Sequence, residues 1–388
     1  MTSNPAGGSP GTEGGPAAGP VTAAEIRQQP RLWELVAAEA QLRRESAAAF
    51  LRPLLSEPRA RIVLAGAGTS AFAGQVLAPA LTGRLRRRVD AVATTDIVAS
   101  PREAFGEDVP TLLVSLARSG DSPESTATTA LADELLSSVR HLIITCNAAG
   151  QLATTQAGRA GSLVVLTPPA ANDRGFAMTS SFTCMLLAAQ LTLDPDGAGG
   201  EQVSRLGAAA GQLLAARAGQ LAELVARGYR RVVYLGSGAL TGLAREAALK
   251  LLELTAGQVV SYWDSSLGFR HGPKAILEPG TLGVVFVSAD PYTRRYDQDI
   301  ADELRRALGD EHVVEVSAQA GDGRPAWHLG GLSQLPDSLI ALPYAVLAQE
   351  FALLTSLDLG LTPDNPFPSG ELSRVVRRVG IYPLAGPA

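Results

Sequence analysis

The chain has 388 residues, of which 46% are hydrophobic and 18% are charged, and its formal net charge at pH 7 is −5. At about 150 residues per domain, this length predicts a globular chain of about two domains. Because no excess of basic residues is present to neutralise a phosphate backbone, the composition argues against a nucleic-acid partner.

We expect neither a targeting segment nor a metal site. The first twenty residues lack the charged start and the apolar stretch of a signal peptide, and the apolar runs look interrupted well before the roughly 20 residues that cross a bilayer. Two cysteines, Cys146 and Cys184, cannot form a disulfide framework, and the four histidines lack zinc-ligand spacing. The expectation is a cytoplasmic protein that contacts no membrane and uses no metal or cofactor.

The N-terminal part of the chain divides into a tail and a helical segment. Residues 1–20 consist almost entirely of Gly, Pro, Ser, Ala and Thr, a composition typical of a disordered tail. From residue 21, apolar side chains recur every three or four positions until Pro53 and Pro58. This spacing predicts an N-terminal helix over residues 21–58.

The rest of the chain contains an internal repeat. Three apolar segments that are typical of buried strands recur in the same order 170 residues later. The pairs are 62–68 with 232–238, 111–114 with 281–284, and 142–144 with 312–314. Near-continuous Val, Ile and Leu strands that alternate with helical segments predict an α/β fold in which mostly parallel sheets are flanked by helices.

This pattern predicts two tandem domains with a connecting helix. We place the first domain at 59–195, a linking helix at 196–228 and the second domain at 229–360. The remaining segment, 361–388, is punctuated by Pro and Gly and is predicted to fold back as a lid.

The first copy of the repeat has the residues of an anion site. Its strand at 111–116 runs into RSGDS at 118–122, where Ser122 and Pro123 are typical of a helix start. Hydroxyls and free backbone N–H groups at a helix N-terminus suit a phosphate, although an ordinary helix cap has the same sequence. The second copy has Asp290 at this place, which would put a carboxylate where the anion would lie.

A second glycine turn follows the first strand of each copy. GAGTS at 66–70 is not a dinucleotide fingerprint, because Ala71 takes the place of the third glycine and no acidic residue follows at the expected distance. We interpret Thr69 and Ser70 as hydroxyl donors to a polyol phosphate.

The helix after the second copy's glycine turn carries a possible acid–base group. Glu246, Lys250 and Glu253 share one face of it. A solvated charged stripe would have the same spacing. However, Lys250 and Lys274 are the only lysines beside 31 arginines, so an ammonium is expected to have a specific role in this stretch. A carboxylate and an ammonium on one face could move a proton between adjacent carbons.

A loop further along contains His271, flanked by Gly and Pro rather than lying on an apolar helix face. A lone histidine is usually structural. This one has Arg270 and Lys274 nearby, and two cations would keep an imidazole neutral and able to act as a base.

In combination, these motifs resemble the double sugar-isomerase (SIS) domain proteins, and among them the tagatose-6-phosphate ketose/aldose isomerase or galactosamine-6-phosphate deaminase type. The resemblance covers about residues 25–384. The segments that carry it are GAGTSAFAG (66–74), SLARSGDSPES (115–125), NDRGFAMTSSFTC (172–184), REAALKLLELTAG (245–257), GFRHGPKA (268–275) and DNPFPSGELSRVV (364–376).

The resemblance implies two tandem flavodoxin-like SIS domains that pair in a homodimer with a shared active site and take a small-molecule sugar phosphate. It implies that Ser70, Ser119 and Ser122 hold the phosphate and that Arg118 adds a charged contact. Further substrate contacts are implied for Thr69, Ala177, Thr179, Glu246, Arg270 and Arg377.

The same resemblance assigns the chemistry to three residues. Glu253 would move a proton between C1 and C2 through an enediol or enolamine. Lys250 would assist at the oxygen or at C2, and His271 from the neighbouring subunit would open the sugar ring. The lid lysine that forms a Schiff base in the related glucosamine-6-phosphate synthase aligns near Arg377, which cannot do that chemistry.

We expect no glutaminase domain before the repeat, which favours the catabolic direction, from galactosamine 6-phosphate to tagatose 6-phosphate and ammonia. Plain isomerisation of a hexose 6-phosphate needs the same proton shuttle and stays open. A non-catalytic sugar-phosphate sensor would need the phosphate site alone, and the presence of Glu253, Lys250 and His271 favours the enzyme.

Overall fold

The computed structural model describes residues 19–319, 326–370 and 379–384. The tail predicted over residues 1–20 therefore lies almost wholly outside the described residues, and so does Arg377.

Two N-terminal helices, α1 (Val21–Arg27) and α2 (Gln29–Leu55), make up the helical segment that precedes the first sheet. They are separate because Pro30 has no N–H to donate to Ile26, whose carbonyl instead accepts from the Gln29 side chain at 2.9 Å. The first α/β unit comprises β1 (Arg61–Gly66), α3 (Thr69–Leu85), β2 (Arg88–Ala93), α4 (Thr94–Ala99), α5 (Pro101–Ala104), β3 (Thr111–Ala117), α6 (Pro123–Leu135), β4 (Val139–Thr145), α7 (Gln151–Gln156), β5 (Ser162–Leu166), η1 (Pro169–Ala171) and α8 (Ser180–Leu193).

The second unit follows a long helix, α9 (Gly200–Ala226). Its elements are β6 (Arg231–Gly236), α10 (Ala239–Leu254), β7 (Val260–Asp264), η2 (Gly268–Arg270), η3 (Pro273–Ile276), β8 (Thr281–Val287), α11 (Thr293–Leu308), η4 (Asp310–His312), β9 (Val313–Ser317), β10 (Ala326–His328) and α12 (Asp337–Asp358).

The predicted repeat is confirmed in the sheets. Both have five parallel strands, in the equivalent orders β2-β1-β3-β4-β5 and β7-β6-β8-β9-β10. The registers of the central pairs are separated by 170 residues, since Arg61 pairs with Thr111 and Arg231 with Thr281. The third pair of strands is offset by 172 residues instead, because Leu142 pairs with Val114 and its counterpart Val314 pairs with Val284.

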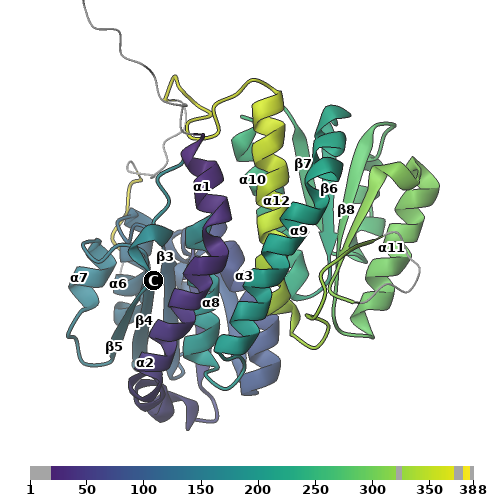
Figure 1. The fold of residues 1–388 in the computed structure, drawn as a ribbon. Coiled ribbons are helices and arrows are strands. Elements are labelled where there is room, and N and C mark those ends of the chain that lie inside the picture. Colours follow the sequence, from purple (N-terminus) through teal and green to yellow (C-terminus); the bar gives the residue numbers. More distant parts are fainter. Residues whose placement is uncertain (1–18, 320–325, 371–378, 385–388) are drawn as a thin grey trace, which may run out of the picture.

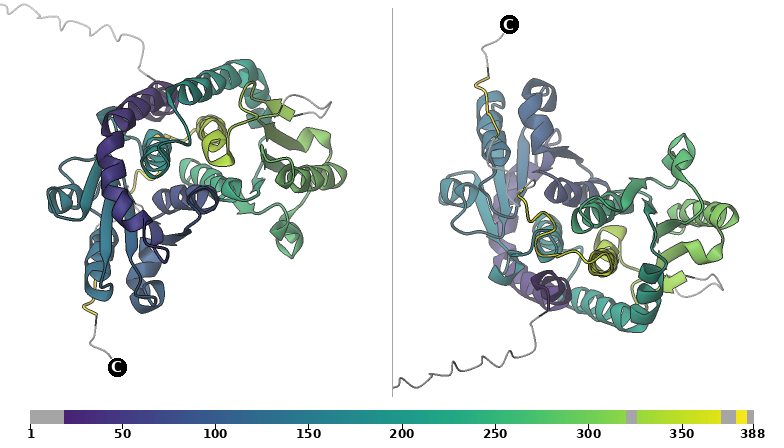
Figure 2. Two further views of the ribbon diagram at one scale, coloured as in Figure 1. Left: turned by 90° about the horizontal axis from the view of Figure 1, so that it is seen from below. Right: turned by 90° about the horizontal axis from the view of Figure 1, so that it is seen from above.

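A layer of helices lies between the two sheets, which occupy opposite sides of the molecule (Figures 1 and 2). The two units meet where α3 crosses α10. A Cβ at Gly242 on α10 would lie 2.7 Å from the backbone nitrogen of Val76 on α3, so the close approach requires glycine there. One apolar core runs through both units and fixes α10 against the first unit.

The last helix corrects the expectation about apolar runs. α12 has 22 residues and is long and apolar enough to cross a bilayer, but 89% of its most apolar window is buried inside the protein. It packs against α9 and α10 in the central helical layer. The length therefore reflects a core helix covered on all sides, which has no polar face to interrupt its sequence.

Candidate active site

A cavity of about 260 Å³ lies where the loops after β1 and β3 meet α10. Its walls come from the end of β3, the first turn of α6, the loop before α8 and the exposed face of α10. The C-terminal ends of parallel strands are the usual place for a ligand in such sheets. The predicted residues that line it together are Thr69, Ser70, Arg118, Ser119, Ser122 and Glu253.

The N-terminus of α6 forms one wall of the cavity. Ser122 occupies the N-cap position, yet its side chain makes no hydrogen bond to the backbone N–H groups of the helix. Its Oγ lies instead 2.6 Å from the Ser125 Oγ. The hydroxyl pair and the positive end of the helix dipole thus face a space where an oxyanion would be stabilised.

The neighbouring loop between β4 and α7 holds this cradle in place. The Asn147 side-chain amide donates to the Ser119 carbonyl at 2.9 Å, and the Gln151 N–H donates to the Asp121 carboxylate at 2.9 Å. Gly120, with φ +70°, makes the turn between them. The loop over residues 119–121 is therefore held by contacts to the Ser119 carbonyl and to the Asp121 carboxylate.

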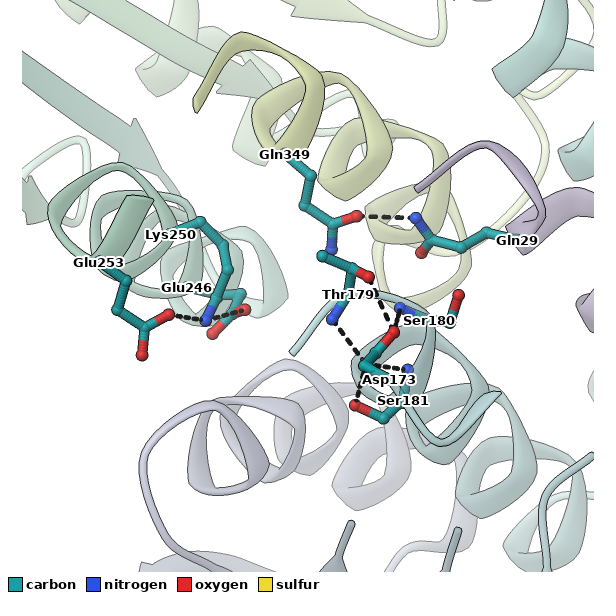
Figure 3. A network of polar contacts seen from close by, with 9 residues as sticks. All are labelled: Gln29, Asp173, Thr179, Ser180, Ser181, Glu246, Lys250, Glu253 and Gln349. Carbon is teal, nitrogen blue, oxygen red and sulfur yellow. Dashed lines mark hydrogen bonds and ion pairs between the residues drawn. The ribbon is translucent and has the colours of Figure 1, made fainter. Parts of the chain in front are cut away.

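Three charged side chains of α10 form a buried group (Figure 3). Lys250 is 1% exposed; its Nζ lies 3.6 Å from Glu246 Oε1 on one side and contacts Glu253 Oε2 on the other. Glu253 alone reaches the cavity, and its side chain is 24% exposed. Lys250 and Glu246 are each 1% exposed and do not line the cavity.

Burial determines the protonation of this group. It raises the pKa of Glu246 to about 8, opposed by the charge of Lys250 and reinforced by that of Glu253. Burial acts to lower the pKa of Lys250, but the two carboxylates outweigh it and leave the pKa raised. Burial thus favours the protonated form of Glu246, and Lys250 contacts Glu253 on its other side.

The loop before α8 is organised by Asp173, a residue to which the sequence analysis gave no role (Figure 3). Its fully buried carboxylate accepts hydrogen bonds from the Thr179 N–H at 2.8 Å, the Ser180 N–H at 3.0 Å and the Ser181 N–H at 2.9 Å. The Thr179 hydroxyl also donates to it, at 2.9 Å. Asp173 thus caps α8, and Thr179 belongs to that cap.

The predicted contacts Ala177 and Thr179 are both fully buried and do not line the cavity. Their neighbours Phe176 and Met178 do. Successive side chains of this segment point alternately into the cavity and into the protein interior. The resemblance therefore identified the right segment, but the side chains that face the cavity are one position away from the predicted ones. The larger side chains at 176 and 178 were the available signal.

His271 and Arg270 also lie away from the cavity in this chain. His271 is exposed between η2 and η3. The Arg270 guanidinium donates to Glu303 of α11 at 2.7 Å, and Lys274 forms an ion pair with the same carboxylate. Glu303 therefore compensates both cations that were expected to act on the His271 imidazole.

The start of the predicted lid lies against the cavity wall. The Phe367 ring is 5.2 Å from the ring of Phe176, and the Asp364 carbonyl accepts from the Phe176 N–H at 3.1 Å. The Asp364 carboxylate binds the first N–H groups of α1, at Val21 and Thr22. The segment over 361–370 thus ties the N-terminal helix to the loop that lines the cavity.

Glu124 is a cavity residue that the sequence analysis did not single out. It lies in the first turn of α6, is 8% exposed, and its Oε2 has no hydrogen-bond partner among the described residues. Its position two residues after the N-cap could have indicated it, because first-turn side chains lie at the positive end of the helix dipole, which favours negative charge.

The expected carboxylate in the second copy is present, but it belongs to Asp297 rather than to Asp290. Asp290 caps α11 by accepting from the Tyr292 and Thr293 N–H groups at 3.0 and 2.8 Å. The place next to the glycine turn is taken by Asp297, which accepts from the Ser237 hydroxyl at 2.6 Å and the Ser288 N–H at 2.9 Å. A side chain from the second turn of α11 therefore fills the space.

Comparison with known proteins agrees with this geometry. The SIS domain family matches residues 54–194. A Streptomyces coelicolor chain named AgaS is 55% identical over 94% of this chain and 95% of its own length. The D-galactosamine-6-phosphate deaminase AgaS of Escherichia coli is 42% identical over 95% and 97%. The crystal structure of tagatose-6-phosphate ketose/aldose isomerase from Escherichia coli superposes with a TM-score of 0.87 at 39% identity, over 96% of this chain and all of that one.

Proposed function

The chain belongs to the AgaS family of SIS-domain enzymes, and on that premise we propose that it deaminates and isomerises a hexosamine phosphate, converting galactosamine 6-phosphate and water to tagatose 6-phosphate and ammonia. One observation carries the proposal. The phosphate cradle at Ser119 and Ser122 and the carboxylate of Glu253 line the same cavity. An anion held at one end and a base at the other fit a substrate with its phosphate at C6 and its reacting carbons at C1 and C2.

Binding would orient the sugar before any proton moves. The hydroxyls of Ser70, Ser119 and Ser122 would hold the phosphate with the N-terminus of α6, and Arg118 and Thr69 would add contacts from the same walls. Phe176, Met178 and Leu249 supply apolar surface that limits water in the cavity. Such binding is nearly uniform between ground and transition states, so it sets KM more than kcat.

The proton transfer would belong to Glu253. In the open-chain sugar, its carboxylate takes the proton from C2, and the electron pair of that C–H bond forms a C1–C2 double bond. The π pair of the C1 carbonyl moves to O1, which takes a proton from solvent, and the product is an enolamine. Return of the proton from Glu253 to C1 gives an iminium at C2, which loses a proton from nitrogen to solvent and becomes an imine. Water then adds to the imine carbon and ammonia leaves, which produces the ketose phosphate.

Lys250 and Glu246 would support this step from behind. The Lys250 ammonium contacts the Glu253 carboxylate and fixes its position at the cavity wall. Glu246, which keeps its proton to about pH 8, lets Lys250 stay buried without an excess negative charge in the group.

The active site is proposed to be completed by a homodimer. His271 is exposed and lies outside the cavity of its own chain, which fits a histidine that enters the cavity of a second subunit. There it would open the sugar ring by moving the proton from O1 to O5 as the C1–O5 bond breaks. Because a sugar phosphate carries up to two negative charges, its substrate would be confined to the cytoplasm, where we place the enzyme.

Plain ketose/aldose isomerisation is a second candidate, since a solved structure at 39% identity has that name. It would use the same Glu253 transfer between C2 and C1, with a hydroxyl at C2 in place of the amine. A panel of hexosamine and hexose 6-phosphates, scored separately for ammonia and for ketose, distinguishes the two.

The test of the mechanism is Glu253→Gln in the full chain. Without the base, kcat for ammonia release from galactosamine 6-phosphate is expected to fall by about 10³-fold, within the usual range for general-base removal. Affinity for the substrate, measured by calorimetry, should change little because Gln keeps the shape. Turnover close to that of the unmodified chain would refute the mechanism.

A further inference from the structure

One helix holds the loop that carries His271. α11 contacts this loop, residues 265–277, through two carboxylates separated by six positions. Asp297 accepts from the Ser266 hydroxyl at 2.5 Å, near the start of the loop. Glu303 binds Arg270 and Lys274, which flank His271 on either side. The loop is thus tied to α11 before, beside and after the histidine.

Glu303 divides its two oxygens between the two cations. The Arg270 Nε donates to Oε2 at 2.7 Å, and the Lys274 ammonium contacts Oε1. The three side chains are 24–35% exposed, so solvent screens them only in part. The hydrogen bonds from Lys274 and Arg270 lower the pKa of Glu303. The carboxylate therefore stays ionised and spans the loop across the position of His271.

We propose that Glu303 is a positioning residue for the ring-opening step, holding the loop so that His271 projects at a fixed angle from the molecular surface. This inference rests on the proposed function of His271 in a second subunit. Positioning is needed because Gly272, next to the histidine, has φ +121° and no Cβ to restrict it. A displacement of about 1 Å at a reacting group can reduce a rate by about 10²-fold.

The geometry also accounts for a lysine at position 274. An ammonium contacts a single carboxylate oxygen and leaves the other for Arg270. A guanidinium prefers to bind both oxygens with its planar fork. Arg at 274 would therefore compete with Arg270 for Glu303 and shift the loop, although the charge is unchanged. In a chain with 31 arginines and two lysines, this is a reason for an ammonium to be kept.

The experiment measures ring opening separately from deamination. Each variant is made in the whole chain and again in the Glu253→Gln background, in which no proton transfer follows. NMR exchange spectroscopy then measures how fast the α and β anomers of galactosamine 6-phosphate interconvert. The variants are Glu303→Gln and Lys274→Arg. The control is Asp302→Asn, the same change of charge at the neighbouring residue of α11, whose carboxylate is 43% exposed and pairs with Arg305 at 3.6 Å.

Glu303→Gln is expected to slow enzyme-catalysed anomer exchange by about 10- to 100-fold and to lower kcat for ammonia release in parallel, with KM nearly unchanged. Lys274→Arg should cause a smaller loss of the same kind, and Asp302→Asn none. We call the contacts of Glu303 with Arg270 and Lys274 the clamp. If Glu303→Gln lowers only the melting temperature and leaves exchange and kcat at their unmodified values, the clamp is merely structural and the inference is wrong.

The same data separate this inference from the proposed function. If the unmodified chain accelerates anomer exchange but releases no ammonia, the deamination proposal fails, while slower exchange in Glu303→Gln still supports the clamp. If the unmodified chain does not accelerate exchange, the clamp is overturned together with the ring-opening role of His271.

Discussion

The two copies of the repeat build the same anion cradle and fill it differently. Each has a glycine turn after its first strand, with Gly68 at φ +53° and Gly238 at φ +57°. Each also has a helix after the neighbouring central strand, α6 after β3 and α11 after β8. In the first copy this space is a cavity of about 260 Å³. In the second it is occupied by the carboxylate of Asp297, held by Ser237 and Ser288.

The difference follows from the need to satisfy buried donors. A strand–turn–helix unit directs N–H and hydroxyl groups to one point, and such groups cost free energy when they are buried without a partner. The second copy supplies its own anion, with Asp337 as a further acceptor for the Ser288 hydroxyl and the Ala289 N–H. The first copy keeps a cavity at the corresponding position. The comparison teaches that the fold builds this strand–turn–helix arrangement twice and that the carboxylate of Asp297 closes one of the two.

The largest effect on the difference between the two copies is expected from Asp297→Ala. The substitution removes three hydrogen bonds to a charged acceptor, so the free energy of unfolding is expected to fall by about 3 kcal/mol. An external anion should be able to occupy the space that the Asp297 carboxylate leaves. We expect added inorganic phosphate to restore part of the melting temperature, compared with chloride at equal ionic strength. Equal melting curves in the two salts would show that the second cradle does not bind an anion.

A matched pair of serine variants sharpens the comparison. Ser119→Ala removes a proposed hydrogen bond to the substrate phosphate, which should raise KM about 10-fold with little change in kcat. Ser288→Ala is the control, because its hydroxyl donates internally to Asp337 at 2.6 Å. That change should cost about 1 kcal/mol of stability and leave KM unaltered. Steady-state kinetics and urea titration of both proteins measure the two effects, and an equal rise of KM would contradict the assignment.

The smallest effect is a difference in pH dependence. Glu246 in the first site keeps its proton to about pH 8 in the folded chain but ionises near pH 4.5 when unfolded. The folded state therefore binds more protons between these values, and stability falls as the pH rises through this range. Glu246→Gln should flatten the curve, and its gain in stability over the unmodified chain should be greatest above pH 8.

Asp297 of the second copy gives the matched measurement. Burial raises its pKa to about 6, against hydrogen bonds from Ser237 and Ser266 that lower it. Its contribution to stability therefore declines between about pH 4 and 6, a window whose upper end lies two units below that of Glu246. Denaturant unfolding from pH 4 to 9 resolves the two windows. A Glu246→Gln curve parallel to that of the unmodified chain would show that Glu246 does not titrate as described.

Much of the fold could be read from the sequence because its signals are local. Near-continuous apolar strands at a constant offset predicted two parallel α/β units, and the registers of β1 and β6 confirm that offset. The cradle at Ser119 and Ser122 was predictable for the same reason, since a helix start after a strand needs only a few adjacent residues. Helical periodicity likewise placed Glu246, Lys250 and Glu253 on one face.

Other features depend on contacts between distant segments. The two-residue slip at β9 arises from loop lengths that no strand pattern records. Asp297, not Asp290, reaches the second cradle because α11 begins at Thr293, three residues beyond Asp290, and places its second turn over the strand ends. Phe176 and Met178 face the cavity because Asp173 draws Thr179 into the cap of α8.

Strand periodicity, glycine turns and the side chains of a single helix depend on neighbours in the chain, so the amino-acid order alone specified two like units, a helix start after a strand, and one charged helix face. Which unit keeps a cavity, which of Glu246, Lys250 and Glu253 lines it, and how Glu303 contacts the His271 loop depend on packing across the core. There, burial and the supply of hydrogen-bond partners come from residues far apart in the sequence, and only folding brings them together.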